Sequence, residues 1–448
     1  MTDNKKFYSN FLKMFFILAV QNIITLSVNL ADNIMLGAYS ESALSGVTAV
    51  NQIQFIFQQV LLSLGDGIVI VGGQYLGQRR LREFKDIAAV AMQSAAAVAI
   101  FLFLAVTLFP TQILGVFTES DIIIKEGAKY LEIVKYTYLM FAVSMILLST
   151  LRAASKVKIA LQLSIMALVI NCSINYVLIY GKLGFPEMGA RGAAIGTLIA
   201  RTAELAVLIF YVFKHDKLIS MRPRDYLARN RVLCRDYFRV LTPSLITSTL
   251  WGFSTAAQTA ILGHMSDIAI AANSAASNLY MMVKSFAVGA ASATGVIIAK
   301  TIGEGDIVRL RSYANKLQRL FVVVGICGGA LLFLIRIPIL SLYSGFDPAT
   351  YKLADHFLMI LSVAFVGMAY QMPCNVGIIK GGGQTLYTMI QDIVSIWCIV
   401  LPVSMLAAFV FDAPPEVVVF CLNSDQLFKC IPAFIMVNYG KWVKKLTR

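Results

Sequence analysis

A carboxylate closes the chain's first apolar run, within the stretch 30–37: Leu30-Ala31-Asp32-Asn33-Ile34-Met35-Leu36-Gly37. The run begins near residue 11 and is long enough to cross a membrane once. Three polar residues lead to Asp32 at successive spacings of four, four and three, so on a helix they form one stripe with it: Gln21, Thr25 and Asn29. Ionisable groups inside hydrocarbon are costly and usually mark the path of an ion or substrate. We therefore predict that the rest of the chain is a membrane scaffold arranged around this carboxylate.

The composition excludes a soluble globular protein. Of the 448 residues, 58% are hydrophobic and 14% are charged, and the mean hydropathy is +0.75. Apolar runs of about twenty residues recur along nearly the whole chain, as in transmembrane helices, and they lack the alternating polarity of barrel strands. We predict an all-α membrane protein with twelve spans, at about 11–36, 45–76, 86–110, 127–151, 159–180, 190–213, 238–262, 268–302, 313–335, 353–379, 386–411 and 416–438.

The net charge of +14 is explained by membrane topology. Cytoplasmic loops of membrane proteins collect Lys and Arg. With the N-terminus inside, most basic residues of this chain fall in the cytoplasmic segments. We therefore expect a multi-pass protein of the cytoplasmic (inner) membrane, with both termini in the cytoplasm and an attraction to anionic lipid. Nucleic acid is not an expected partner.

Cysteine and histidine positions argue against enzyme chemistry. Six of the seven cysteines fall inside apolar spans, and no CxxC or Cys/His metal spacing occurs. The three histidines lie at loops or span ends, without acids or cysteines at ligand spacing: His215, His264 and His356. We expect no cofactor, and an intramembrane enzyme is a remote alternative.

An internal repeat predicts the architecture. The stretch 31–37 aligns with Ala257-Gln258-Thr259-Ala260-Ile261-Leu262-Gly263 at an offset of 226 residues, and the basic turns 77–85 and 303–311 align at the same offset. Six spans per repeat make the repeats parallel, related by an axis along the membrane normal, with a cavity between them. We predict two six-helix lobes, 1–213 and 238–448, joined by a basic cytoplasmic linker at 214–237. This is the layout of an alternating-access carrier.

At this point the sequence resembles the multidrug and toxic compound extrusion (MATE) family over essentially its whole length. The most specific stretch joins the fifth and sixth spans: Asn175-Tyr176-Val177-Leu178-Ile179-Tyr180-Gly181, then Gly184, Pro186, Gly189 and Gly192-Ala193-Ala194-Ile195-Gly196-Thr197. Further landmarks are Gly73-Gln74-Tyr75-Leu76-Gly77, Trp251 with Gly252, Lys380-Gly381-Gly382-Gly383 and Lys441-Trp442-Val443-Lys444-Lys445. The resemblance implies twelve helices in two lobes that export organic cations or drugs in exchange for Na⁺ or H⁺.

The resemblance also implies roles for three residues of the first lobe. Asp32 matches the family's first-span aspartate, a cation- or proton-coupling group, and Asn171 matches an asparagine beside it. Asn175 stands where many members have a second aspartate. Na⁺ is a candidate ligand of these three side chains, because carboxylate and amide oxygens are hard ligands. H⁺ is equally reasonable, because a desolvated carboxylate holds its proton more tightly. The choice of ion stays open.

The sequence departs from the family at other positions. No acid follows Pro243 in the seventh span before Asp267, and the proline common early in the first span is absent. Proline-driven bending of that helix is therefore not expected here.

Other polar residues inside spans are candidates for the cavity. Asp66 shares a helical face with Gln52 and Gln59, and we consider it a possible replacement for the carboxylate lost at position 175. Gln258 is the repeat counterpart of Asp32. Lys284 needs a partner if buried, and Asp392 is a candidate both for that pairing and for substrate or ion coupling.

The main functional hypothesis is a monomeric secondary antiporter. It would export cationic or amphipathic organic compounds, such as drugs and toxins, in exchange for Na⁺ or H⁺ by alternating access. A flippase for a lipid-linked precursor is the alternative within the same superfamily, but it favours a strongly cationic cavity. The acids at 32, 66 and 392 argue against that.

Overall fold

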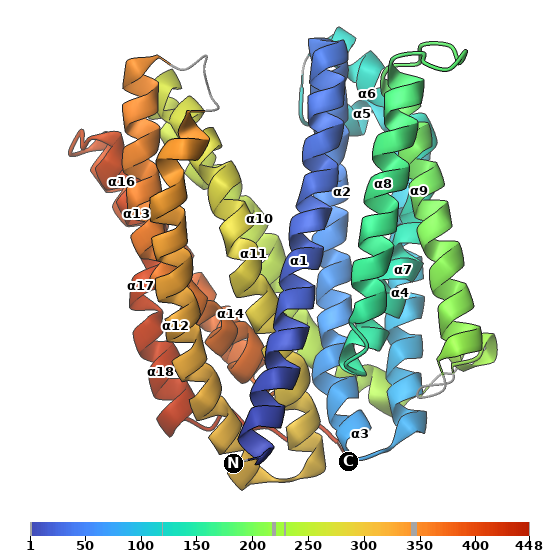
Figure 1. Cartoon of the computed structure of the whole chain (residues 1–448), viewed down its shortest axis with the longest axis vertical. Helices are drawn as coiled ribbons and strands as arrows, with labels where there is room; N and C mark the ends of the chain where they lie inside the picture. Colours follow the sequence, from blue (N-terminus) through green and yellow to red (C-terminus); the bar gives the residue numbers. More distant parts are fainter. Residues whose placement is uncertain (1, 119, 217–220, 228–229, 342–346, 448) are drawn as a thin grey trace. The chain divides into compact units, whose positions relative to one another are not determined.

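The computed structural model describes residues 2–118, 120–216, 221–227, 230–341 and 347–447, and this described part contains helices and no strand (Figure 1). The helices of the first half are α1 (Thr2–Tyr39), α2 (Glu41–Gly67), α3 (Gly73–Gly77), α4 (Leu81–Leu108), α5 (Pro110–Gly115), α6 (Asp121–Val134), α7 (Thr137–Ala153), α8 (Lys158–Ile179) and α9 (Ala190–Phe210). Those of the second half are α10 (Arg231–Met265), α11 (Asp267–Glu304), α12 (Ile307–Leu340), α13 (Pro348–Met372), α14 (Thr385–Asp392), α15 (Leu401–Phe409), α16 (Pro415–Asn423), α17 (Asp425–Phe428) and α18 (Cys430–Tyr439).

Twelve spans, as predicted, account for these helices. In the described residues ten helical segments are long and apolar enough to cross a membrane, and α6 with α7 forms an eleventh span that is bent by 57°. Helix α10 supplies the twelfth with 35 residues. It is less apolar than the others because Ser and Thr recur along it. The predicted fourth span began near 127, but its first helix begins at Asp121.

Short π-helical segments interrupt several spans that the sequence predicted as continuous. They cover Ile68–Gly72 after α2, Pro373–Ile379 after α13 and Ile393–Val400 after α14. Pro373 cannot donate a backbone hydrogen bond, so the regular ladder is broken where it enters the helix. Such segments widen a helix locally and are frequent at functional sites.

The internal repeat is visible in the helix caps. Ser40 precedes α2 and accepts a hydrogen bond from the Ala43 backbone N–H at 3.4 Å. Ser266 precedes α11 and accepts from the Ala269 N–H at 3.1 Å. Both serines have extended backbone, as N-cap residues do. The two halves therefore enter their second helices through the same local structure.

Two compact units make up the chain, and each is described by itself. The N-unit is Gln21–Phe238, and the C-unit is Met1–Val20 together with Arg239–Arg448. The bounds of these units differ from those of the predicted lobes at the start of the chain, where the first twenty residues group with the second half, and at the linker, which groups with the first half. Helices α1 and α10 thus contribute residues to both units.

Small residues allow close helix packing within the N-unit. A Cβ on Gly46 of α2 would lie 2.5 Å from the Gly127 backbone nitrogen of α6, and a Cβ on Gly192 of α9 would lie 2.7 Å from the Leu178 backbone of α8. Those two contacts require glycine. Near the C-terminal end of α2, the Tyr237 hydroxyl donates a hydrogen bond to the Leu64 carbonyl at 2.6 Å.

Aromatic packing explains why the first turns of α1 belong to the C-unit. The ring of Phe7 stacks on that of Tyr313 with centroids 4.1 Å apart. Phe15 lies 6.3 Å from Phe286, and a Cβ on Gly289 would meet the backbone of Ala19 at 2.8 Å. Offset aromatic pairs of this kind stabilise packing beyond the area they bury.

The basic linker is attached to the N-unit by ion pairs. Asp216 pairs with Lys156, and Asp225, in a short 3₁₀ helix at Pro223–Leu227, accepts from Lys85 at 2.9 Å. Partial burial raises the pKa of the Asp225 carboxyl, but the Arg222 backbone N–H and the Lys85 ammonium outweigh it and hold that pKa below its ordinary value. Residues 217–220 and 228–229 of the predicted linker lie outside the described residues.

Candidate functional site

Asp32 lies beside a hydrogen-bonded pair of buried asparagines on α8. The Asn175 side-chain Nδ2 donates to Asp32 Oδ1 at 2.6 Å and to Asn171 Oδ1 at 3.2 Å. Asn175 is fully buried and Asn171 is 2% exposed. The two asparagines are four residues apart, so they share one face of α8. The structure therefore brings together all three residues of the predicted first-lobe site.

The hydrogen-bond chain continues into α9. Asn171 Nδ2 donates to the Thr197 hydroxyl at 3.4 Å. Tyr130 of α6 is buried and contacts the Thr197 hydroxyl. It lies close enough to Asp32 to interact electrostatically with the carboxylate. Four helices, α1, α6, α8 and α9, thus converge on one carboxylate.

Gly196 of α9 fixes how the Asn175 amide is held. An ideal Cβ at this position would lie 1.9 Å from Asn175 Oδ1, so a larger residue would collide with that oxygen. Asn175 Oδ1 is buried and has no hydrogen-bond partner among the described residues. The amide therefore presents its nitrogen to Asp32 and leaves its oxygen facing Gly196.

Arg201 is a nearby positive charge that interacts with Asp32 without a direct hydrogen bond. The Arg201 guanidinium attracts the Asp32 carboxylate at longer range. It pairs with Glu204 at 2.8 Å and lies 4.6 Å from the centre of the Phe141 ring. Arg201 and Glu204 are three residues apart on α9, a spacing at which opposite charges can neutralise each other. Arg201 thus forms its ion pair with Glu204, and the direct hydrogen-bond donor to Asp32 is the neutral Asn175 amide.

The site offers one carboxylate together with neutral amide and hydroxyl groups. The described residues contain no group of three or more His, Cys, Asp or Glu side chains able to hold a metal ion. The site has one carboxylate plus neutral oxygens, the hard ligands that alkali cations accept. Asn175 Oδ1, which has no hydrogen-bond partner among the described residues, is one further oxygen that a cation would find available as a ligand.

The rest of the predicted polar stripe on α1 takes no part in this hydrogen-bond chain. The Thr25 hydroxyl donates to the Gln21 backbone carbonyl at 3.0 Å, within its own helix. Asn29 is exposed, as is Gln52 on α2, while Gln59 is half-buried. Their predicted role in a substrate cavity stays a prediction.

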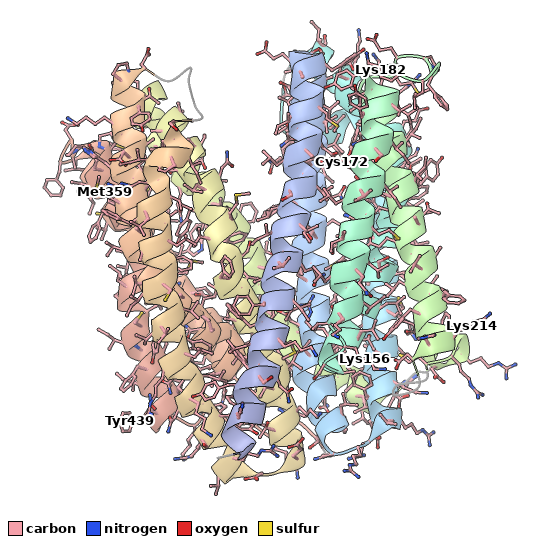
Figure 2. All side chains as sticks on the ribbon, viewed as in Figure 1. Lys156, Cys172, Lys182, Lys214, Met359 and Tyr439 are labelled. Atoms are coloured by element: carbon pink, nitrogen blue, oxygen red, sulfur yellow. The ribbon has the colours of Figure 1, made fainter. Side chains whose placement is uncertain are left out.

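Asp66 does not replace the acid that position 175 lacks. Asp66 lies 26 residues after Ser40, whereas Asp32 lies 8 residues before it on the helix that runs the opposite way, so the two carboxylates differ in level by about 18 residues, or about 27 Å of helix. The Asp66 carboxylate lies near the Arg152 guanidinium and the Tyr237 hydroxyl instead. Its charge therefore belongs to the opposite end of the N-unit, where Lys156 and Lys214 also lie; Lys182 marks the other end (Figure 2).

The C-unit pairs its charges differently from our expectation. Lys284 does not pair with Asp392. Its ammonium lies 5.0 Å from the centre of the Trp251 ring, a cation–π contact. Asp392 instead accepts from Lys429 at 2.9 Å, and Lys429 also pairs at 3.1 Å with Asp425, which lies four residues before it. Gln258, the counterpart of Asp32, donates to Ser254 of its own helix at 3.3 Å.

Sequence reasoning missed the contacts of four residues at the site. Gly196 and Thr197 stand inside the signature stretch that carried the family resemblance, yet their contacts were not anticipated. Arg201 was assigned only to its ion pair. Tyr130 had no signal in the sequence, because a buried tyrosine in an apolar span is usually a packing residue.

Comparisons with known proteins agree with this architecture. The MatE family model matches residues 18–177 and again 243–406, once in each half. The probable multidrug resistance protein NorM of Thermotoga maritima is 24% identical over 434 residues, which are 96% of this chain and 92% of that protein. The probable multidrug resistance protein YoeA of Bacillus subtilis is 26% identical over 373 residues, 81% of this chain and 78% of that protein.

Solved structures share the fold. A mutant of the Vibrio cholerae MATE transporter VcmN superposes with a TM-score of 0.89 at 14% identity, covering 100% of this chain and 99% of that one. A multidrug resistance MATE family transporter of the MOP superfamily, in an outward-facing conformation, gives a TM-score of 0.84 at 16% identity, covering 96% and 94%.

Twelve spans in two repeats, with a carboxylate and a buried asparagine pair inside the first, define a polytopic membrane transporter. Because the MatE model matches most of the chain, in both halves, the protein belongs to the MatE family, the multidrug and toxic compound extrusion transporters.

Proposed function

We propose that this protein is a secondary antiporter that exports cationic or amphipathic organic compounds in exchange for Na⁺ or H⁺ by alternating access. The substrate class rests on relatives named as probable multidrug resistance proteins. The proposed location is the cytoplasmic membrane with both termini inside, and the proposed functional form is a monomer. The observation that carries the proposal is the hydrogen bond from Asn175 to Asp32.

The amide of Asn175 is suited to report whether Asp32 is charged. An N–H donor stabilises an ionised carboxylate, and the nitrogen faces Asp32 at 2.6 Å. When Asp32 binds a proton or Na⁺, the amide oxygen becomes the better partner, because it accepts from a carboxyl O–H or coordinates the ion. The amide then has to turn.

Turning the amide affects two helices. Asn175 Nδ2 also donates to Asn171, and Asn171 donates to Thr197 of α9. Rotation breaks the first of these bonds and frees Asn171 to change its own. Ion binding on α1 is thereby linked to the packing of α8 against α9, which is the local step that coupling requires.

The decisive test is Asp32→Asn in sealed membrane vesicles. The substitution keeps the shape and a hydrogen bond to Asn175 but removes the charge, so ion-driven export of a cationic dye should fall at least tenfold at equal protein level. Asp121→Asn, an exposed carboxylate at the start of α6, is the matched control and should retain full export. Unchanged export in Asp32→Asn would contradict the coupling role.

The coupling ion is tested by the driving force. Dye transport is followed under an imposed Na⁺ gradient at equal pH, and separately under a pH gradient without Na⁺. Transport driven by one gradient and abolished by Asp32→Asn identifies that ion. Transport under neither gradient would overturn antiport itself.

A further inference from the structure

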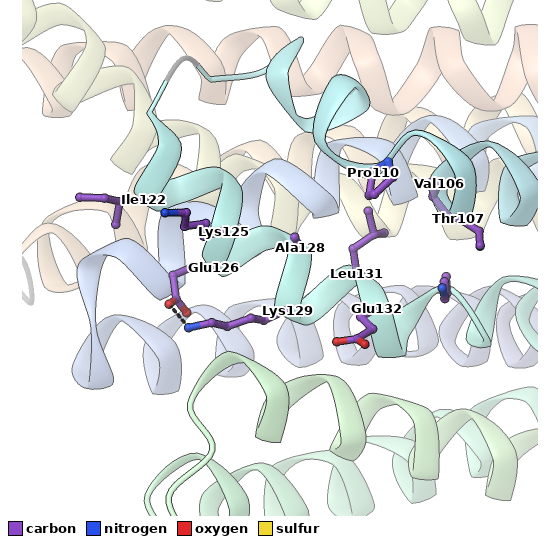
Figure 3. Close-up of a pocket in the computed structure, with 11 residues that line it drawn as sticks. Val106, Thr107, Pro110, Ile122, Lys125, Glu126, Ala128, Lys129, Leu131 and Glu132 are labelled. Atoms are coloured by element: carbon purple, nitrogen blue, oxygen red, sulfur yellow. Dashed lines mark hydrogen bonds and ion pairs between the residues drawn. The ribbon is translucent and has the colours of Figure 1, made fainter.

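A cavity of about 530 Å³ lies on the N-unit between the end of α4 and α6. Its apolar wall includes Val106, Pro110 and Leu131, and Pro110 and Leu131 point toward one another in Figure 3. The other side of the cavity is charged because α6 carries its polar residues on one face. The cavity therefore has an apolar side and a charged side, a combination suited to binding an amphiphilic molecule.

Three lysines line the cavity, and two of them lack a carboxylate partner in the described part of the chain. Lys129 pairs with Glu126 at 2.5 Å, shown by the dashed line in Figure 3. The second lining glutamate, Glu132, is taken by Arg191 at 3.3 Å. Lys125 is exposed. Lys135 is held by aromatic faces, with its ammonium 5.9 Å from the Phe103 ring centre. The cavity thus has an excess of positive charge.

This excess is unusual for its place in the topology. The end of α4 and α6, the first part of the bent fourth span, lie toward the outer side in the predicted orientation, where basic residues are few. Lys135 is 17 residues before Arg152, the basic residue at the inner end of α7, a helical rise of about 26 Å. That is close to the thickness of the hydrocarbon core, about 30 Å. If Arg152 marks the inner membrane surface, this rise places Lys135 near the level of the outer-leaflet phosphates.

We propose that this cavity binds an anionic phospholipid of the outer leaflet. The headgroup phosphate lies among the ammonium groups of Lys125, Lys129 and Lys135, and an acyl chain follows the apolar surface of α4. Exposed side chains continue that surface toward the inner end of α4, including Leu104 and Phe101. Bound lipid contacts both α6 and α4, and it stabilises their packing at the point where the fourth span bends by 57°.

The test measures lipid affinity of the whole purified protein in neutral phosphatidylcholine nanodiscs. Phosphatidylglycerol is titrated in, and binding is followed by the rise in unfolding temperature and by retained lipid in native mass spectrometry. A lysine near an anionic headgroup contributes about fivefold in affinity, so Lys125→Gln with Lys135→Gln should bind about 25-fold more weakly. Lys125→Gln alone should bind about fivefold more weakly, and it removes no contact from the folded core.

The matched control replaces two exposed lysines of the same membrane side, Lys182→Gln with Lys352→Gln, which do not line the cavity. Equal weakening in the control would show surface attraction only and would overturn the proposal. Glycerol 3-phosphate is the third arm. If the free headgroup stabilises the protein as strongly as the lipid does, the site takes a soluble phosphate and the lipid assignment is wrong.

Discussion

At the scale of single residues, Asn175 and Gly196 decide what Asp32 can do. The amide nitrogen serves the carboxylate, while the amide oxygen lies against the one residue that leaves it space. A second aspartate at position 175 would compete for protons with Asp32, since two close carboxylates cannot both ionise easily. In the proposed mechanism the amide responds to the charge on Asp32 without carrying charge itself, and the site binds one ion through one acid.

Gly196→Ala tests that arrangement. Its Cβ would lie 1.9 Å from Asn175 Oδ1, so the amide must leave Asp32 or α9 must shift. We expect ion-driven export to fall at least tenfold, with a loss of about 1–3 kcal/mol in stability from overpacking. Both are measured on the purified protein, by vesicle transport and thermal unfolding. Gly252→Ala is the control, because no heavy atom lies within 4 Å of the added carbon. Full export by Gly196→Ala would show that the amide orientation does not matter.

Much of this site was predictable, for a physical reason. A charged residue in an apolar run is rare enough to be informative by itself, so Asp32 was found from the sequence. Asn171 and Asn175 came from the family resemblance. Gly196 and Thr197 depend on how α9 packs against α8, and Tyr130 depends on the bend before α7. Those are tertiary contacts, and residue type and period do not encode them.

At the scale of elements, the helices of the C-unit are held at their breaks by buried charge. Lys429 lies between α17 and α18 and is 3% exposed. It pairs with Asp425 of α17 and with Asp392, the last residue of α14, after which the helix becomes π-helical. One ammonium therefore joins three helix ends.

Lys429→Met should destabilise the protein strongly. Removing one member of a buried ion pair leaves the other charge uncompensated, which costs about 3–5 kcal/mol. We expect a marked fall in unfolding temperature, whereas Lys352→Met, at an exposed lysine, should cause almost none. Adding Asp425→Asn to Lys429→Met should recover part of the loss. A double variant no more stable than the single one would show that packing, and not charge, accounts for the effect.

The elements themselves were predicted better than their interruptions. Hydropathy located all twelve spans because a bilayer demands about twenty apolar residues whatever their packing. It did not locate the break between α6 and α7 or the π-helical segments. Lys135 and Tyr136 at that break are compatible with a continuous helix, so the bend follows from neighbours and not from local sequence.

At the scale of the whole molecule, the linker is a part of the N-unit and not a free tether. We expect trypsin to cleave at the exposed Arg224 about fivefold faster in Lys85→Gln, because a partly exposed ion pair contributes up to about 1 kcal/mol. Lys182→Gln is the control.

The pKa of Asp225 is below its ordinary value, so its ionised form, and the stability it adds, persist down to about pH 4 and are lost only in stronger acid. Protection should therefore be constant between pH 6 and 8. Equal cleavage of Lys85→Gln and the parent would mean that the pair does not hold the linker.

The two repeats share helix caps but not chemistry, and this asymmetry yields a last prediction. Gln258 takes the place of Asp32 in the second repeat, yet its amide bonds Ser254 on its own helix. Moving the acid by Asp32→Asn with Gln258→Asp should therefore restore no ion-driven export, because the new carboxylate has no asparagine pair to respond to it. Vesicle transport under both gradients measures this, with Gln258→Asp alone as the control for folding and substrate passage. Recovery in the double variant would mean that either lobe can couple, and that the Asn171–Asn175 pair is not what makes the first repeat the ion-binding one.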